Sequence, residues 1–485
     1  MKDAIKSLAQ MIDASYTEPT AALSEKALPL AEELLKRKPQ SKDRAYIYYC
    51  MANAWHRISY EKGNTWDWAS EPLEKEIFYL RKSIIEKDFY THPKELQAMV
   101  YTNLGNYLST AGRTYEAVEY WNIALRLFPN FGMTLLGKAQ GLTAYANAML
   151  EGEDRIKIFL YCEELYKRAI ASGTTYSNLA NLIQRETVGL TNFLNQFKVS
   201  RDILDRNPKS FKYKSKKEKE YRCWCLRHSL IMNPLNLIEH YKEITDSTHI
   251  PSITTPTGSS MPIYYPYFNQ LKQEYTTARY LCFEGEEEQR KSHFSDKSVY
   301  IIDALDYTTH NIHFEKIKLA FKTAYSVLDK IAFFLNDYFD LKQNSNFNFR
   351  NIWYENTNKG LESGSLLKVF EGRENWPLRG LFWLSKDFAF TDKEKYAIEP
   401  DAENLKNIRD YMEHKFFRIT MMCSNGEIPS ITELDLINKT IKILKLTNAA
   451  LAYLSVAVAI EEHKKRKSDK KEGIVMPINM HSLKR

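Results

Sequence analysis

The sequence is poor in glycine and proline, with 17 and 16 among 485 residues. Scarcity of these turn-forming residues disfavours folds made of many short strands and favours helices. The six cysteines form no paired CxxC motifs, which argues against a structural zinc site. We therefore expect a helical protein that needs no metal and no other cofactor.

The chain also lacks an evident targeting or membrane-spanning segment. Its N-terminus, MKDAIKSLAQMIDASY, has no apolar run of the signal-peptide kind. No stretch approaches about twenty consecutive apolar residues. We therefore expect a cytoplasmic protein with reduced thiols and no membrane partner. A chain of 485 residues is too long for one core, so two or three domains are expected, and a net charge of +7 permits a polyanionic partner without requiring one.

The clearest pattern present is YTNLGNYLSTAGRTYEAVEYWNIALRLFP, over 101–129. Gly105 and Ala117 are small residues where two helices would cross closely, Trp121 is a large side chain between them, and Pro129 would end the second helix. This order and spacing resembles the tetratricopeptide repeat, a helix–turn–helix unit of about 34 residues. A single repeat cannot bury its apolar face, so neighbouring repeats are expected.

Weaker copies of the pattern lie on both sides. Ala27 to Pro39 is similar to a second helix, 46–88 to a repeat whose turn is lengthened by GNTWDWASEP, and 136–169 to a further repeat. We therefore predict a TPR-like helical repeat domain over residues 1–245. An unrelated array of helical hairpins would give much the same shape.

The composition changes at DSTHIPSITTPTGSSMPIYYP, residues 246–266, where helical periodicity disappears. This predicts a linker over 246–275 and a second domain over 276–485. In that domain, residues 314–341 carry one apolar stripe typical of an amphipathic helix. ALAYLSVAVAI, within a helix expected from 431 to about 465, is apolar on nearly all sides and predicts the core of a bundle. The basic HKKRKSDKK after it is expected to form a solvated tail.

An arginine followed four to six residues later by a histidine occurs twice, at Arg222–His228 and at Arg409–His414. Nothing around Arg222–His228 suggests a second catalytic group, so a structural role is expected. In IRDYMEHKFF, Asp410 and His414 are four apart on one helix face, so the carboxylate could hold the imidazole. The alternative for this helix is a set of ordinary charge pairs on a wet surface.

A helical bundle that carries Arg-polar-x3-His on its third helix resembles the HEPN superfamily (higher eukaryotes and prokaryotes nucleotide-binding). The resemblance covers about residues 300–465, and AFKTAYSVLDKIAFFLNDYF and ENLKNIRDYMEHKFF are the segments most similar to it. It implies an all-α fold, with an N-terminal TPR-like helical solenoid followed by a C-terminal HEPN-like four-helix bundle. Active members are metal-independent ribonucleases in toxins, CRISPR effectors and antiviral systems.

The resemblance implies an endoribonuclease that leaves 2′,3′-cyclic phosphate and 5′-hydroxyl ends. His414 would transfer protons, Arg409 would bind the phosphate and Asp410 would orient the imidazole. Arg409 and His414 are five residues apart, which is about 140° around a helix. The two side chains of one protein chain therefore point in different directions. HEPN ribonucleases are dimers, which implies a homodimer through the bundle and a composite site. The expected substrate is RNA such as tRNA or mRNA, and a toxin or antiphage role follows from the resemblance alone.

Two other functions stay open at this point. The protein could be a non-catalytic adaptor whose solenoid binds a protein or peptide and whose bundle only dimerises, or a bundle that binds nucleotide without cutting RNA. Candidate RNA-binding residues are Lys214, Lys216 and Lys217, in SFKYKSKKEKEYRCW, and Lys415, next to the motif. The alternative for the lysine cluster is a charged turn between repeats.

Overall fold

A computed structural model of the chain describes residues 1–63, 67–149, 152–173, 179–196, 212–239, 242–256, 262–288, 293–302, 307–343, 347–355, 365–388, 398–421, 428–468 and 473–475. These residues are mostly helical, with a few three-residue strands, as expected for an all-α protein. The chain forms two compact units. The N-terminal unit comprises Met1–Arg206 and Glu362–Ala402, and the C-terminal unit comprises Asn207–Leu361 and Glu403–Arg485.

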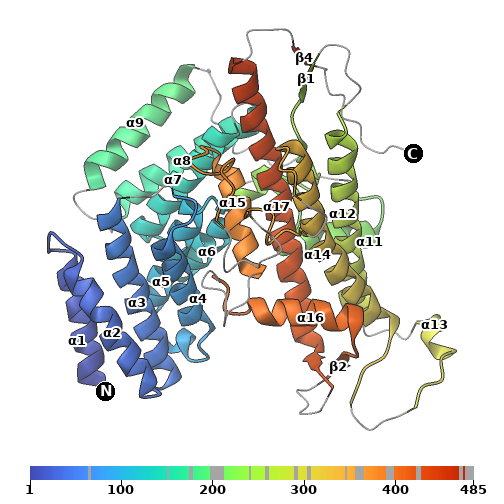
Figure 1. Ribbon diagram of the computed structural model, residues 1–485, viewed down its shortest axis with the longest axis horizontal. Helices are drawn as coiled ribbons and strands as arrows, with labels where there is room; N and C mark the ends of the chain where they lie inside the picture. Colours follow the sequence, from blue (N-terminus) through green and yellow to red (C-terminus); the bar gives the residue numbers. More distant parts are fainter. Residues whose placement is uncertain are drawn as a thin grey trace. The chain divides into compact units, whose positions relative to one another are not determined.

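The N-terminal unit is an array of helices in which neighbours in sequence pack side by side (Figure 1). Its described helices are α1 (Lys2–Ser15), α2 (Ala22–Lys36), α3 (Ser41–Lys62), α4 (Glu71–Ile85), η1 (Phe89–Thr91), α5 (Lys94–Thr110), α6 (Thr114–Leu127), α7 (Gly132–Ala148), α8 (Glu153–Ala171) and α9 (Ala180–Gln196). The helical repeat organisation predicted from the sequence is therefore present. The lengthened turn expected after α3 includes residues 64–66, which lie outside the described residues.

The strongest repeat, α5 with α6, packs as its small and large residues predict. Trp121 is fully buried, and its Nε1 donates a hydrogen bond to Asn106 Oδ1 at 2.9 Å. A Cβ atom added to Gly105 would lie only 2.6 Å from Trp121 Nε1, so only glycine fits there. Ala117 is also fully buried, and α6 ends at Leu127, two residues before Pro129. The close crossing of the two helices therefore follows from these small residues.

The N-terminal unit also contains a segment from far along the chain, α15 (Trp376–Ser385) with the short helix η5 (Lys386–Phe388). A Cβ atom on Gly112 would lie 2.8 Å from Gly380 N, so the α5–α6 turn touches α15 backbone to backbone. Gly112 has φ +86°, which glycine adopts without strain. Arg379 donates to the carbonyl oxygens of Thr110 at 2.6 Å and Asp67 at 2.8 Å. This segment is therefore part of the core of the repeat unit.

The C-terminal unit is built on long helices that pack along one another. Its described helices are α11 (Lys216–Arg227), η3 (Pro234–Leu237), α12 (Tyr264–Glu288), α13 (Phe294–Lys297), α14 (Ile312–Tyr338), α16 (Ala402–His414) and α17 (Glu433–Ser468). Helices α12, α14 and α17 pack together, and α16 crosses them (Figure 1). The strands β1 (Thr254–Pro256) and β4 (Gly473–Val475) pair antiparallel, and β2 (Arg418–Thr420) and β3 (Ser430–Thr432) pair parallel.

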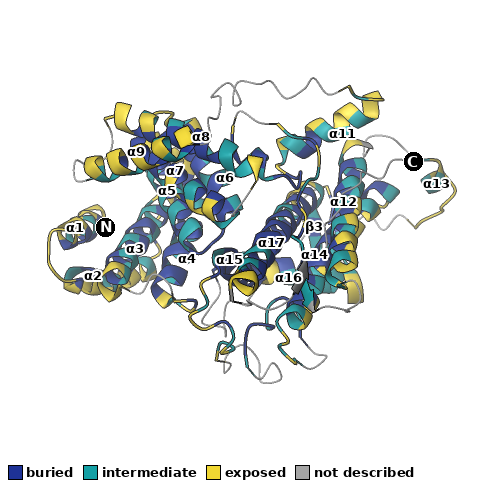
Figure 2. Cartoon of the chain, turned by 90° about the horizontal axis from the view of Figure 1, so that it is seen from above, coloured by how far each residue is buried: buried dark blue, intermediate teal, exposed yellow. Residues whose placement is uncertain are grey.

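Helix α17 is the apolar centre of the C-terminal unit and is buried over most of its length (Figure 2). Among the described helices it alone is long and apolar enough to cross a membrane by length and composition, over Glu433–Lys467, and 83% of its most apolar window is buried. Thr447 Oγ1 donates to the Ala324 carbonyl of α14 at 3.0 Å. Packing against α14 thus accounts for the apolar character. The basic tail begins inside α17, and residues 469–472 and 476–485 lie outside the described residues.

These units differ from the expected boundaries, which were 1–245, 246–275 and 276–485. The C-terminal unit begins at Asn207, and α12 begins at Tyr264, inside the expected linker. Asp246 accepts two hydrogen bonds of 2.8 Å from Arg279 and one of 2.8 Å from the Met232 N–H. The segment around Asp246 is therefore bonded to α12 and to a turn of its own unit, and residues 257–261 lie outside the described residues.

Candidate functional site

Arg409 lies on α16 with its guanidinium directed at α14. Its Nη2 is 3.7 Å from Asp329 Oδ2, and its Cζ is 4.9 Å from the centroid of the Tyr325 ring. Buried Leu405 and Ile408 seat α16 on the unit and fix this orientation. The Arg409 side chain is 34% exposed, so it is partly accessible to solvent.

His414 is the last residue of α16, and its side chain is 73% exposed. Its Nε2 lies 3.7 Å from Glu413 Oε2, and the same oxygen lies 3.9 Å from Arg409 Nε. The imidazole and the guanidinium therefore share one carboxylate oxygen although they leave the helix in different directions.

The partners of Asp410 differ from the expected ones. Its carboxylate lies 3.7 Å from Lys406 Nζ and 4.0 Å from Arg409 Nη1. Among the described ion pairs, the carboxylate next to His414 belongs to Glu413. Spacing alone suggested Asp410 because residues four apart share a face, but Glu413 reaches the imidazole from the neighbouring position at the helix end.

Sequence reasoning missed Tyr325 and Asp329, which α14 presents to Arg409. Burial raises the pKa of Asp329, although the N–H of Phe349, at 3.2 Å, and Arg409 act in the opposite direction. Burial also raises the pKa of Tyr325 to about 12. Tyr325 and Asp329 are four residues apart, so they share a helix face, and this spacing could have indicated a joint contact. It was overlooked because the apolar residues of α14 dominate the pattern of that segment.

Two of the four candidate RNA-binding lysines, Lys216 and Lys217, lie close to carboxylates through their side chains. Lys217 Nζ lies 2.7 Å from Glu284 Oε1, and this hydrogen bond raises the pKa of Lys217. Lys216 lies 3.7 Å from Glu220, and the backbone N–H of Lys214 donates to Glu218. Lys415 Nζ lies 5.2 Å from the centroid of the Tyr411 ring on α16, so it alone of the four stands beside the motif.

The other arginine–histidine pair has the geometry of a structural element. Arg222 Nη1 donates to the Ile244 carbonyl at 2.7 Å. Burial, followed by the charges of Lys445 and Arg227, lowers the pKa of His228 to about 4. His228 is therefore neutral at pH 7 and packs against the Trp224 ring, with centroids 5.0 Å apart.

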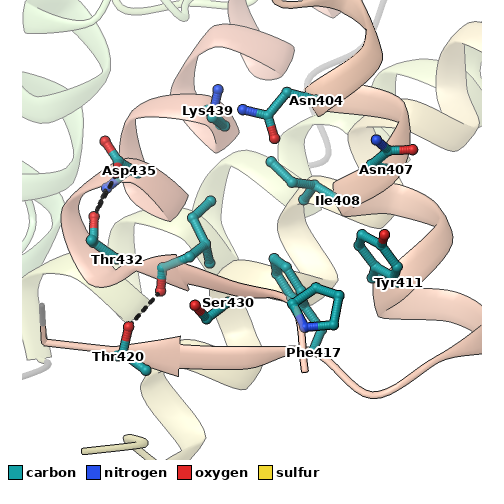
Figure 3. A pocket seen from close by; sticks show the side chains of 12 residues that line it. Asn404, Asn407, Ile408, Tyr411, Phe417, Thr420, Ser430, Thr432, Asp435 and Lys439 are labelled. Carbon is teal, nitrogen blue, oxygen red and sulfur yellow. Dashed lines mark hydrogen bonds between the residues drawn. The ribbon is translucent and has the colours of Figure 1, made fainter. Parts of the chain in front are cut away.

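A pocket of about 320 Å³ lies next to the motif, between α16, the β2–β3 pair and the first turns of α17 (Figure 3). Polar side chains from α16 and α17 (Asn404, Asn407, Asp435 and Lys439) share its lining with aromatic rings. The Tyr411 and Phe417 rings stack with centroids 5.9 Å apart and planes at 13°. Among the described residues no group of three or more His, Cys, Asp or Glu side chains could hold a metal ion.

A helical unit that carries an Arg-x4-His pair, with a partly buried arginine and an exposed histidine, on a helix crossing its bundle has the features of a HEPN-type domain, a class whose members are typically ribonucleases. Residues 255–461 match the family model described as LA2681-like HEPN, and the C-terminal part of this chain is accordingly a HEPN domain. The comparisons found no match among curated proteins and none among solved structures. The family match therefore supports a nuclease-type domain in this chain.

Proposed function

We propose that this protein is a metal-independent endoribonuclease whose active groups are Arg409 and His414. The observation that carries the proposal is the shared oxygen of Glu413, which lies 3.9 Å from Arg409 Nε and 3.7 Å from His414 Nε2. A carboxylate oxygen in that position stands where an oxygen of a bound phosphodiester would be held by the same two groups.

The chemistry uses the substrate's own 2′-hydroxyl. Its oxygen attacks the phosphorus, its proton passes to a base, the bond from phosphorus to the 5′-oxygen breaks, and that oxygen takes up a proton. His414 carries out proton transfer because an imidazole changes its protonation state near neutral pH. Arg409 offsets the charge of the phosphorane. Asp410, beside Arg409, holds the guanidinium instead of the imidazole.

The proposed active form is a homodimer through the HEPN domain, with RNA such as tRNA or mRNA as substrate. Arg409 faces α14 while His414 projects from the end of α16, so a second copy would complete the set of donors at one phosphate. Exposed apolar side chains after the motif, Phe416 at 85% and Met421 at 72%, suit such an interface.

The wider role that we propose is that of a cytoplasmic toxin or antiphage effector, and it rests on the resemblance alone. A protein or peptide partner on the helical array would act as its trigger. The described array already packs against α15 of its own chain, so such a partner would bind elsewhere on the repeats or displace this segment.

A non-catalytic adaptor is the second candidate, and the surroundings of Arg409 favour it. Carboxylates of Asp329, Asp410 and Glu413 lie within 4.0 Å of the guanidinium, as in a structural ion-pair cluster. In this case the bundle would dimerise and the solenoid would bind its partner, without RNA cleavage.

Incubation of the purified full-length chain with total RNA or tRNA in EDTA distinguishes these functions. We expect cleavage without metal, because neither His414 nor Arg409 chemistry needs one. The new 3′ ends should resist ligation until the cyclic phosphate is removed, and the new 5′ ends should accept phosphate from a kinase. Intact RNA would favour the adaptor, whereas cleavage that requires Mg²⁺ would overturn the metal-independent chemistry.

Replacement of Glu413 by glutamine tests the shared oxygen. Because the carboxylate competes with a phosphate for Arg409 and repels it, we expect Glu413→Gln to bind single-stranded RNA about two- to five-fold more tightly, the size of a partly exposed ion pair. Fluorescence anisotropy in a His414→Ala background measures binding without cleavage. Glu403→Gln, at an exposed carboxylate in the first turn of α16, is the matched control. Weaker binding by Glu413→Gln would mean that Glu413 organises the site.

A further inference from the structure

We propose that the pocket beside the motif receives the nucleobase of the nucleotide next to the scissile phosphate, with Asn404 and Asn407 reading its edge. The inference rests on the proposed function, since it assigns the RNA contact that would set cleavage preference. The ligand that we propose for this pocket is an unstacked base of single-stranded RNA.

The position of the pocket follows from helix geometry. Asn407 and His414 are seven residues apart on α16, so they lie about 20° apart around the axis and about 10 Å along it. Tyr411, a lining residue, lies one turn before His414. His414 therefore stands on the pocket side of α16, whereas Arg409, about 100° further round from Ile408, faces α14. A strand of RNA with its phosphate at His414 would pass along this side.

The pocket offers the groups that base recognition needs. Each asparagine amide has a donor and an acceptor side by side, which matches the paired donors and acceptors on a base edge. The stacked rings of Tyr411 and Phe417 form an apolar wall of the kind on which bases stack. In Figure 3, Asn404 and Lys439 lie at one end of the pocket and these rings at the other. A cavity of about 320 Å³ is within the size range of small-ligand sites.

The floor of the pocket is held rigidly. Thr432 Oγ1 donates to Asp435 Oδ2 at 2.7 Å and accepts from the Asp435 N–H at 3.1 Å, which caps the start of α17. Ile419 pairs with Ile431 in the parallel β2–β3 ladder, and Thr420 below the pocket is fully buried. Lys415, over the Tyr411 ring, adds a cation at the rim for the adjoining phosphate. A site that is formed in advance loses less conformational entropy on binding than a flexible one.

The test uses the full-length chain and four short single-stranded RNAs that differ at one base. Anisotropy in the His414→Ala background measures binding, and cleavage of the same RNAs by the unmodified chain measures preference. We expect a preferred base with a discrimination of about tenfold or more, the size of one paired contact. Asn404→Ala and Asn407→Ala should reduce that ratio to about twofold. Asn438→Ala, on an exposed position of α17 beside Lys439, should leave it unchanged.

The outcomes separate the two proposals. Cleavage with a base preference that Asn404→Ala and Asn407→Ala leave intact overturns the pocket assignment and leaves the ribonuclease standing. Base-dependent binding that these variants lose, in a chain that never cleaves, supports the pocket and overturns the ribonuclease. Equal binding of all four RNAs by the His414→Ala chain overturns the pocket assignment. Unchanged thermal unfolding of each variant confirms that folding is not the cause.

Discussion

Replacement of Asp387 by alanine is expected to destabilise the N-terminal unit by about 3–5 kcal/mol, as for other buried ion pairs that lose one member. Asp387 is fully buried in η5. Its Oδ1 accepts from Arg81 Nη1 at 2.6 Å and from Arg113 Nη1 at 2.8 Å, and Oδ2 accepts from both residues as well. The alanine variant would leave two buried guanidiniums facing each other without the anion between them.

Hydrogen exchange of α4 and α15, together with thermal unfolding, measures this effect. The control is Glu33→Ala, which removes an exposed pair with Arg37 and should cause no measurable change. Asp387→Asn, which keeps the shape of the side chain, should also destabilise the unit because it removes the charge. Unaltered exchange in α4 and α15 after Asp387→Ala would mean that this cluster does not hold the segment in place.

The same carboxylate makes stability depend on acid pH. Burial alone would raise the pKa of Asp387, but Arg113 and Arg81 hold it well below its usual value. A group whose pKa is lower in the folded than in the unfolded protein stabilises fully above its unfolded pKa of about 3.9. That contribution is lost as the pH falls further. The unmodified chain should therefore lose more of its unfolding free energy below about pH 4 than the Asp387→Asn variant does, and thermal unfolding of both chains across this pH range measures the difference.

Replacement of His414 by alanine is expected to reduce RNA cleavage by about 10²- to 10⁴-fold, the usual contribution of a general acid–base group. The side chain is 73% exposed and pairs only weakly, at 3.7 Å, with Glu413, so stability should not change measurably. Initial rates in EDTA, with thermal unfolding in parallel, measure the two effects separately.

The matched control is His310→Ala, at another exposed histidine of the C-terminal unit. It should cleave like the unmodified chain. If the site is composite, a mixture of His414→Ala and Arg409→Ala chains should regain part of the activity that neither has alone, because one of the two sites in a mixed dimer can hold both intact residues. Full activity of His414→Ala would overturn the assignment of His414 as the group that transfers protons.

Several features could be predicted from the sequence because they depend on contacts between near neighbours. Gly105 and Trp121 are sixteen residues apart by their numbers and meet within one hairpin, so their sizes sufficed to predict the crossing. The apolar run in α17 predicted a core helix for the same reason. The Arg-x4-His spacing placed both groups on one helix, and the family match over 255–461 supports the domain assignment.

Other features escaped prediction because they join distant parts of the chain. The expected second domain of 276–485 included α15, yet Asp387 bonds to Arg81 across 306 positions within the N-terminal unit. No local pattern indicates which buried charge will meet which. The contact of Arg409 with Asp329 also joins two separate helices, and no spacing within either helix indicated it.

The sequence by itself determined that this chain is helical and that its first half repeats hairpins, and it led to the prediction of Arg409 and His414 as the motif pair. Only the tertiary structure decided that residues 362–402 complete the repeat unit, that Arg409 faces Asp329 of α14, and that a polar pocket adjoins the motif. The physical reason is that periodicity and residue size act over a few turns of helix. Burial of charge and the shape of a cavity instead depend on every segment that packs around them.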